Sequence, residues 1–369
     1  MQNKKKRVFH IVSHFDVGGA ERVAVNIAKS QTSDFEYHVV ELIRAHSAFT
    51  KVFIKELEDA GIKYHLGFVP ELHFHYLFER LAAVTFPLWF IFLFLKYRPD
   101  VIHSHTEMPD LAVYSFFKIF PTLLRHCKVV RTIHNTQLWT GLKKTGMKVE
   151  KFFIRNNSNI AISVAVRDNY AEEYHHTAPI IYNGVAHSPQ KPFDGIVEGK
   201  KNILFAGRLE PQKGIDVLVE IISRLSGDGR FFFHVVGDGS MHAFVQSKLG
   251  GLPNVSLRGP IHGLPAYLSS FDYLLMPSVF EGLSIMSLEA SIEGLPVIAN
   301  SCPGLRDTLP DDWPLKVNGN SIDAYMHIFN EIVAKEDKDK LGRMAHDFAA
   351  AKFGVRQMQT SYEKAYCSK

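Results

Sequence analysis

Short apolar runs alternate along the chain with longer stretches in which apolar positions recur at helical spacing. Runs of this length are typical of buried strands, and the stretches between them are long enough for crossover helices. The predicted strands of the first half are 7–13, 37–43, 62–65, 99–106, 128–132, 158–163 and 179–182. Those of the second half are 202–207, 230–236, 255–259, 272–277 and 295–300. The alternation predicts two α/β domains, each a doubly wound, Rossmann-like parallel sheet.

The length of the chain and one irregular segment suggest where the domains divide. A chain of 369 residues is too long for one ordinary core. Residues 186–201 (AHSPQKPFDGIVEGKK) are rich in proline, glycine and charge, as domain linkers are. We therefore predict an N-terminal domain over 1–186, a linker over 187–201 and a C-terminal domain over 202–350. A C-terminal helix lies within 351–369, and packing back on the first domain is one arrangement for it.

The composition narrows the class of protein. With 46% hydrophobic and 22% charged residues the chain is that of a soluble globular protein, and a net charge of +4 does not call for nucleic acid as a partner. Cys127, Cys302 and Cys367 are odd in number and far apart, which favours reduced thiols over disulfides or a zinc site. The basic run 4–7 leads into a short apolar stretch that suits a first strand better than a secretory signal. We expect a cytoplasmic protein.

The stretch 72–98 (LHFHYLFERLAAVTFPLWFIFLFLKYR) is unusually apolar. Its part 81–95 carries no charge, and Lys96 and Arg98 follow it. It is too short to span a bilayer comfortably, and Pro87 interrupts it. Two interpretations remain open: a helix buried against the sheet, or a helix whose aromatic face lies among lipid headgroups beside basic residues.

Two carboxylates mark the stretch 280–294 (FEGLSIMSLEASIEG). The stretch follows the predicted strand 272–277, so Glu281 falls in a strand-to-helix loop and Glu289 about two turns into the helix, with Ser284 as a plausible N-cap. A helix start favours an anion, whereas a carboxylate beside it is tolerated where it accepts hydrogen bonds from hydroxyl groups. A nucleotide-sugar supplies phosphates, sugar hydroxyls and ribose hydroxyls together. The spacing alone also fits a loop glutamate and a solvated helix glutamate.

Two cations follow the first predicted strand of the second half. Arg208 and Lys213 lie between the strand 202–207 and an apolar helix that opens at Gly214. Ligands bind at the carboxyl edge of such sheets, and a diphosphate is held well by one forked and one point-like cation. Either residue alone fits a solvated loop.

The first half offers weaker candidates. Gly18-Gly19 opens an amphipathic helix and lets a ligand approach the backbone, although a tight turn explains it equally well. His134 follows a strand at the carboxyl edge, where a structural role and a contact with substrate are both open. His103 and His105 share one face of a strand, but no third metal ligand is apparent, so we predict no metal site.

These motifs together resemble glycosyltransferase family four (group 1), retaining enzymes of the GT-B fold in which two Rossmann-like domains face a central cleft. The resemblance covers nearly the whole chain and includes the E-x7-E signature of the family. The matching motifs are VGGAER at 17–22, PDVIHSH at 99–105, TIHN at 132–135, YNGV at 182–185, GRLEPQKG at 207–214, VVGDG at 235–239 and PSVFEGLSIMSLEASIEGLPVIA at 277–299.

The resemblance implies residue roles in the second half. Glu281 holds hydroxyls of the transferred sugar, and Glu289 holds the ribose. Arg208 and Lys213 bind the diphosphate. The further nucleotide-sugar-binding residues that it implies there are Gly259 and Pro260, near the base, and Gly282, Leu283 and Ser284.

In the first half, the resemblance implies that the domain binds the acceptor. Gly18 and Gly19 lie against the donor phosphate and the acceptor, and His134 contacts the donor sugar near its reactive carbon. The catalytic residues implied are His134, Glu281, Arg208 and Lys213. Two departures affect the fine donor contacts: Ala186-His187 follows the NGV turn, and CPGLRD at 302–307 replaces a Gly-Gly turn.

The expected reaction is transfer of a hexose or N-acetylhexosamine, with retention, from a nucleotide-sugar that we expect to be UDP-linked. The expected acceptor is a lipid-linked saccharide or oligosaccharide of a bacterial capsule or lipopolysaccharide. Family members need no divalent metal, and we expect no cofactor beyond the donor. A peripheral contact with the cytoplasmic face of the inner membrane is consistent with the apolar stretch. The alternatives are an epimerase or phosphorylase of the same fold, or a non-catalytic protein that binds sugar nucleotides.

Overall fold

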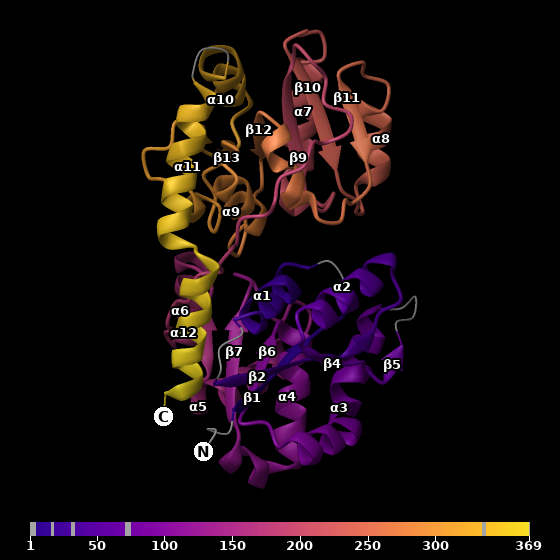
Figure 1. Ribbon diagram of the computed structural model, residues 1–369, viewed down its shortest axis with the longest axis vertical. Helices are drawn as coiled ribbons and strands as arrows, with labels where there is room; N and C mark the ends of the chain where they lie inside the picture. Colours follow the sequence, from indigo (N-terminus) through magenta and orange to yellow (C-terminus); the bar gives the residue numbers. More distant parts are fainter. Residues whose placement is uncertain (1–4, 16–17, 31–33, 71–74, 334–336, 369) are drawn as a thin grey trace. The chain divides into compact units, whose positions relative to one another are not determined.

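The computed structural model describes residues 5–15, 18–30, 34–70, 75–333 and 337–368. The chain divides into two compact units (Figure 1). Met1–Gly184 and Val355–Lys369 form the first unit, and Val185–Gly354 forms the second. The chain therefore returns to the first unit with its last helix.

The first unit is built on a parallel sheet with strand order β4-β2-β1-β6-β7-β8. Its strands are β1 (Lys6–Val12), β2 (Phe35–Glu41), β4 (Lys63–His65), β6 (Val101–His105), β7 (Lys128–Ile133) and β8 (Asn159–Ala161), and β3 (Ile43–Arg44) pairs separately with β5 (Val69–Pro70). Its helices are α1 (Gly19–Ala28), α2 (Ala48–Asp59), α3 (His75–Tyr97), α4 (Glu107–Ile119), the 3-10 helix η1 (Pro121–His126), α5 (Lys143–Arg155), α6 (Val164–Tyr174) and α12 (Val355–Cys367).

The chain adds strands to this sheet in two directions, starting from β1 at its centre. From β1 the chain proceeds to β2 on one side and later to β6 on the other, so the order of strands reverses between β1 and β6. The strand predicted at 179–182 is wrong, because only an isolated bridge joins Ile180 to Ala161. Pro179 has no N–H to donate to a ladder, which limits pairing there.

Helix α3 has two different faces. Phe86, Phe90 and Phe94 are buried, and the ring of Phe90 packs edge-on against Phe116 of α4 with centroids 5.0 Å apart. The opposite face exposes an apolar stripe that consists of Leu81, Val84, Leu88, Phe92 and Leu95. The buried face agrees with a helix packed within the unit, whereas the contact of the other face with lipid headgroups stays a prediction. By length and composition alone, Glu79–Tyr97 is also apolar enough to cross a membrane.

A buried ionic cluster joins the sheet of the first unit to α4 and α5. The Nε of Arg131 lies 2.7 Å from Oδ2 of Asp110, and its Nη1 lies 2.6 Å from Oε2 of Glu150. Trp139 and Tyr170 also donate hydrogen bonds to Glu150. Burial raises the pKa of Asp110 to about 7, although the guanidinium of Arg131 opposes that shift. The cluster fixes β7 against its covering helices.

Helix α12 docks on the first unit through buried hydroxyl groups. The hydroxyl of Tyr362 lies 2.9 Å from Oγ1 of Thr132, and that of Tyr366 lies 2.8 Å from Nδ1 of His103. Both tyrosines are buried, and α12 also packs against α1. The last helix of the chain is therefore part of the first unit.

The second unit repeats the same architecture with strand order β11-β10-β9-β12-β13-β14. Its strands are β9 (Lys201–Ala206), β10 (Phe231–Val236), β11 (Val255–Arg258), β12 (Tyr273–Met276), β13 (Val297–Asn300) and β14 (Lys316–Val317). Its helices are η2 (Pro211–Lys213), α7 (Ile215–Arg224), α8 (His242–Leu249), η3 (Leu264–Ser270), α9 (Ile285–Ile292), η4 (Arg306–Thr308), α10 (Ile322–His327), the π-helical η5 (Ile328–Ile332) and α11 (Lys338–Lys352).

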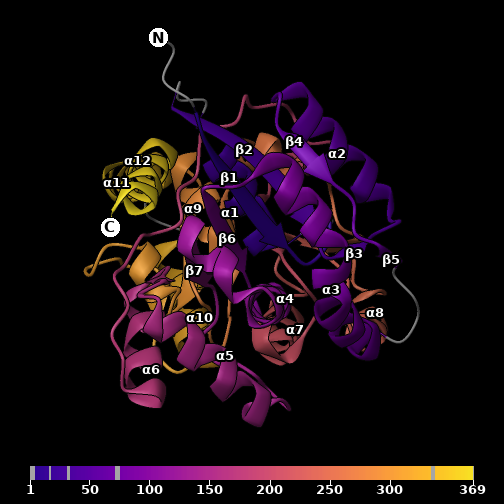
Figure 2. The ribbon, with the colours of Figure 1, turned by 90° about the horizontal axis from the view of Figure 1, so that it is seen from below.

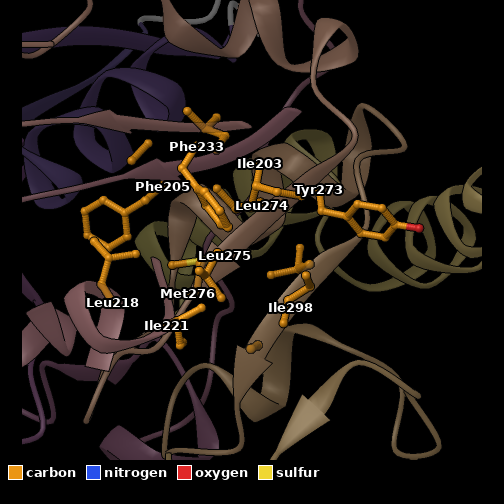
Figure 3. Close-up of a cluster of buried hydrophobic side chains, with 14 of the residues drawn as sticks. Ile203, Phe205, Leu218, Ile221, Phe233, Tyr273, Leu274, Leu275, Met276 and Ile298 are labelled. Atoms are coloured by element: carbon orange, nitrogen blue, oxygen red, sulfur yellow. The ribbon is translucent and has the colours of Figure 1, made fainter. Parts of the chain in front are cut away.

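The core of the second unit fills the space between β9, β10, β12 and α7. Figure 3 shows Ile203 and Phe205 of β9 with Phe233 of β10 and Leu218 of α7 in this cluster. Here the strand order reverses between β9 and β12, because β10 and β11 lie on one side and β12 to β14 on the other. Two parallel, Rossmann-like sheets confirm the predicted α/β class.

The segment 187–201 packs on the second unit. The backbone N–H of Ser188 donates to Oε1 of Glu293 at 2.7 Å, and Phe193 is buried in the core cluster. The guanidinium of Arg258 lies over the ring of Phe193, 4.9 Å from its centroid. The chain crosses between the units at Gly184 and Val185, ahead of this segment.

We expect Arg131→Met to lower the free energy of unfolding of the first unit by about 3–5 kcal/mol, because it leaves Glu150 buried without its cation. Urea unfolding followed by tryptophan fluorescence measures this in a Trp313→Phe background, where Trp89 and Trp139 report on the first unit alone. Arg155→Met, at an exposed position of α5, is the control and should change stability by less than about 0.5 kcal/mol. Equal stability of the two variants would contradict the prediction.

Candidate functional site

The loop between β12 and α9 carries the predicted signature. Ser284 caps α9, because its Oγ accepts a hydrogen bond from the backbone N–H of Ser287 at 3.3 Å, which confirms the predicted N-cap. Glu281 lies in the loop, as predicted. Glu289 is half-buried in the second turn of α9, nearer the helix start than we expected. Of the residues between them, Gly282 is half-buried and Leu283 is buried.

Lys213 and Glu281 form an ion pair at the point where the strand order reverses. The Nζ of Lys213 lies 2.7 Å from Oε1 of Glu281, and the hydroxyl of Ser278 donates to the same oxygen at 2.8 Å. Glu281 is buried, whereas the Lys213 side chain is 17% exposed. No described residue donates a hydrogen bond to Oε2 of Glu281. A carboxylate oxygen and a cation are thus held side by side.

Two glycines allow the loops around this pair to touch. Gly214 has φ +68°, and a Cβ there would lie 1.9 Å from the carbonyl oxygen of Pro277. Gly304 has φ +76°, and a Cβ there would lie 2.1 Å from the carbonyl oxygen of Glu281. The backbone N–H of Glu281 also donates to the carbonyl of Pro303 at 3.0 Å. The turn at 302–307, where the sequence departs from the family pattern, therefore supports Glu281 directly.

Arg208 is joined to the same loops by Gln212. Its Nη2 lies 3.3 Å from Oε1 of Gln212, and Nε2 of Gln212 donates to the carbonyl of Phe280 at 3.1 Å. The guanidinium is exposed. Gly259 and Pro260 follow β11, the edge strand of this sheet, and are exposed at the same carboxyl edge. The structure thus brings Arg208, Lys213, Glu281 and Ser284 together, with Gly259 and Pro260 farther along the edge.

Gly18, Gly19 and His134 belong to the first unit. Gly18 is the N-cap residue of α1 with φ −151°, and the carboxylate of Glu21 lies against it, where a Cβ at position 18 would be 2.0 Å from Oε2 of Glu21. Gly19 begins the helix and has open space around its Cα hydrogens. His134 follows β7 at the carboxyl edge of the sheet and is 9% exposed.

Buried histidines lead from His134 into the sheet. Its Nε2 lies 3.1 Å from Nδ1 of His105, and Nε2 of His105 lies 2.9 Å from Nδ1 of His10. The imidazole of His103 bonds separately, to Thr132 at 2.7 Å and to Tyr366 at 2.8 Å.

The expectation that His103 and His105 lack a third partner for a metal needs correction. His10 of β1 joins them, and one nitrogen of each residue lies within 4.8 Å of the others. The hydrogen bonds already engage both nitrogens of His103 and of His105. The geometry is therefore that of a hydrogen-bonded cluster.

Burial keeps these histidines neutral. It lowers the pKa of His10 and of His134 to about 3, and it lowers the pKa of His103 and of His105 well below the ordinary value. Nothing else in their surroundings favours the charged form strongly enough to oppose desolvation.

Three residues of these sites were missed at the level of the sequence. Ser278 fixes Glu281, Gln212 connects Arg208 to the signature loop, and His10 completes the histidine chain. His10 had a signal, because a histidine in a run as apolar as β1 requires a buried hydrogen-bond partner. Ser278 and Gln212 had none, since the contact of Ser278 depends on the conformation of the signature loop and that of Gln212 on how two loops meet.

Comparison with known proteins identifies the class. The chain superposes on the structure of HepE from Anabaena, solved with UDP and glucose, with a TM-score of 0.79 at 18% identity over 98% of this chain and 99% of that one. The sucrose-phosphate synthase of Thermosynechococcus elongatus gives 0.77 at 18% identity, over 98% of each chain. Two Rossmann-like units that superpose in this way have the GT-B fold.

Sequence comparison identifies the family. The models for Glycosyltransferase Family 4 and for Glycosyl transferases group 1 match residues 17–188 and 200–334. A 41.2 kDa protein in the cps region of Klebsiella pneumoniae is 28% identical over 74% of this chain and 80% of its own length. The capsular polysaccharide biosynthesis glycosyltransferase CapH of Staphylococcus aureus is 26% identical over 80% and 81%. The chain belongs to the group 1, family 4 glycosyltransferases.

We expect the first unit to lose stability as the pH falls below about 6.5. The pKa values of His10, His103, His105 and His134 are lowered on folding, so the unfolded chain binds protons that the folded unit does not. Their contribution is fully present above the unfolded pKa and decreases toward about pH 3, by about 1.4 kcal/mol per pH unit for each histidine. The pKa of Asp110 is raised on folding, so its contribution to stability increases as the pH falls and offsets the loss from about one histidine.

Thermal unfolding of the Trp313→Phe protein, followed by fluorescence at pH 8, 7, 6 and 5, measures this loss. The midpoint should be nearly constant from pH 8 to 7 and should fall steeply from pH 6 to 5. A midpoint that does not change down to pH 5 would show that the histidines are not held neutral.

Proposed function

We propose that this glycosyltransferase moves a hexose or N-acetylhexosamine, with retention, from a UDP-linked donor to a lipid-linked or oligosaccharide acceptor in the biosynthesis of a bacterial surface polysaccharide. The Lys213–Glu281 pair beside the start of α9 is the observation that carries the proposal. The names of CapH and of the Klebsiella protein support the pathway, and HepE, solved with UDP and glucose, supports the base.

The arrangement of charges suits the departure of a nucleoside diphosphate. Lys213 and Arg208 place positive charge at the carboxyl edge, and the uncompensated N–H groups at the start of α9 add to it. Such preorganised donors stabilise the charge that develops on the leaving group by several kcal/mol. Oε2 of Glu281 accepts a hydrogen bond from a sugar hydroxyl, and Glu289 accepts from the ribose. No divalent metal and no further cofactor are needed for this distribution of charge.

The state of Glu281 favours one route to retention. Its Oε1 already accepts hydrogen bonds from Lys213 and Ser278, which engage the lone pairs of that oxygen. A carboxylate held in this way is a poor nucleophile for double displacement. We therefore propose that the acceptor attacks on the face from which the diphosphate leaves, and that an oxygen of the leaving group takes the proton of the acceptor hydroxyl.

We expect Lys213→Ala to lower turnover by about 10²–10³-fold, the loss that follows removal of one preorganised donor. Release of nucleoside diphosphate and formation of acceptor-linked sugar are measured with UDP-, GDP- and ADP-sugars, and UDP-sugar should be used best. Lys248→Ala, at an exposed position of α8, is the matched control. Circular dichroism checks that Glu281, deprived of its partner, has not disturbed the fold.

Full turnover of a folded Lys213→Ala protein would remove the diphosphate assignment. A product that is an epimer, a sugar phosphate or free sugar in place of an acceptor-linked saccharide would favour an epimerase, a phosphorylase or a hydrolytic activity instead.

We also propose that the first unit rests on the cytoplasmic face of an anionic membrane through α3. In the stripe on its exposed face, Leu88 is 69% and Phe92 is 71% exposed, and exposed Arg80 and Lys96 flank the stripe. Helix α4 lies between α3 and α5, so the three form one layer (Figure 2). On α5 the basic residues Lys144, Lys148, Lys151 and Arg155 are exposed at helical spacing.

An apolar stripe and a basic stripe in one helical layer match a surface of acyl chains beneath anionic headgroups. Such a contact would keep the enzyme beside a lipid-linked acceptor. The exposed apolar stripe has no covering partner among the described residues, which makes an anionic phospholipid surface the occupant that we propose.

We expect the double change Leu88→Glu and Phe92→Glu to weaken binding to vesicles with a third of anionic lipid by at least about tenfold, since it removes apolar insertion and adds like charge. Co-sedimentation with the vesicles at low and high salt measures it. Val52→Glu, at an exposed apolar position on α2, is the control. Undiminished vesicle binding by a folded double variant would rule out α3 as the contact.

A further inference from the structure

A chain of three imidazoles ends at His134, for which we predict a contact with the donor sugar. His10 lies on β1, His105 on the neighbouring β6, and His134 just beyond β7, so three strands of one sheet each supply a member. The two nitrogen–nitrogen distances are 2.9 Å and 3.1 Å, both within hydrogen-bonding range. Each neutral imidazole has one N–H and one lone pair, so the direction of the bonds is set once any member is fixed.

His10, at the inner end of the row of histidines, fixes the direction of these hydrogen bonds. Nε2 of His10 is buried and has no hydrogen-bond partner among the described residues. If it carried the proton, a buried N–H would remain unsatisfied, which is costly and rare in folded proteins. The favoured form of His10 therefore has its proton on Nδ1 and donates it to Nε2 of His105. His105 must then carry its own proton on Nδ1 and donate to Nε2 of His134.

The outer end follows from the same reasoning. Because Nε2 of His134 accepts from His105, the single proton of the neutral ring is on Nδ1. No described residue forms a hydrogen bond with this Nδ1, and the atom is not among the fully buried polar atoms without a partner, so it remains accessible. His134 thus presents an N–H group outward at the carboxyl edge of the first sheet.

We propose that His105 is a positioning residue, which with His10 behind it holds His134 as the Nδ1–H tautomer so that this ring donates a hydrogen bond to an oxygen of the sugar substrate. The role of the donated bond rests on the proposed function, whereas the tautomer does not. His134 in this form is a neutral donor and has no free nitrogen with which to act as a general base. This assignment also gives a reason for placing three neutral histidines in a buried position.

The ring nitrogens report the tautomer directly. Protein labelled with ¹⁵N-histidine, in the full chain with EDTA at pH 7.5, gives one pair of imidazole nitrogen signals for each histidine, and His134→Gln assigns its own pair. Free neutral histidine favours the Nε2–H form. We expect His134 in the wild-type protein to show a protonated Nδ1 and an unprotonated Nε2, with the same shifts whether or not zinc is added after removal of EDTA.

Two substitutions at position 105 separate positioning from packing. His105→Leu removes the donor, and we expect His134 to shift toward the Nε2–H form and kcat to fall about tenfold with the KM for the donor changed less than about twofold. His105→Asn places an amide N–H near the position of Nδ1 and should restore the Nδ1–H form and most of kcat. Thermal unfolding identifies any variant that has lost the fold. If His105→Leu is such a variant, His10→Phe takes its place, because it removes the residue that fixes the proton of His105 and so the hydrogen bond that His105 donates to His134.

Three outcomes would overturn the assignment: a wild-type His134 protonated on Nε2, a tautomer that is the same in His105→Leu, or nitrogen shifts of the metal-bound kind that vanish with EDTA. Wild-type protein that shows the Nδ1–H form but transfers no sugar would count against the proposed function and leave the tautomer assignment standing.

Discussion

The ion pair between Lys213 and Glu281 is the interaction on which the candidate site depends. A carboxylate as deeply buried as Glu281 is stable only with a cation and hydrogen-bond donors beside it. Lys213 and Ser278 supply these, and they lie in the connections that follow two different strands. The pair therefore ties the loop after β9 to the loop after β12. It also leaves Oε2 of Glu281 without a hydrogen-bond donor among the described residues and part of the Lys213 side chain exposed.

Both sheets place their polar groups at the same topological position. In the second unit the pair lies where the strand order reverses between β9 and β12, and in the first unit the histidine chain begins where it reverses between β1 and β6. At such a point neighbouring loops diverge to opposite faces of the sheet, which opens room for a ligand. The repeated architecture thus gives one unit a charged edge and the other a neutral, hydrogen-bonding one. The histidines of the first unit are kept neutral by burial.

Local patterns predicted what depends on local structure. The short strands, the cap at Ser284 and the loop position of Glu281 follow from side-chain periodicity and turn chemistry, and the structure confirms them. The dual character of α3 was not predictable, because all of its faces are apolar and only packing on α4 decides which one is buried. The partner of His134 was equally hidden, since His105 lies on a different strand, and the bond from Ser278 to Glu281 depends on the conformation of their loop. The strand expected at 179–182 failed where Pro179 interrupts the hydrogen-bonding ladder.

The return of α12 to the first unit affects how the protein is made. Most of the first sheet leaves the ribosome before residue 184, yet Thr132 and His103 find their hydroxyl partners only when Tyr362 and Tyr366 emerge, after the whole second unit. Until then the surface of the first sheet that α12 covers, which has both polar and apolar groups, remains exposed. Such surfaces make nascent chains prone to misassembly. The first sheet is therefore covered only after α12 has been synthesised, which makes synthesis of this helix a condition for the maturation of the first unit.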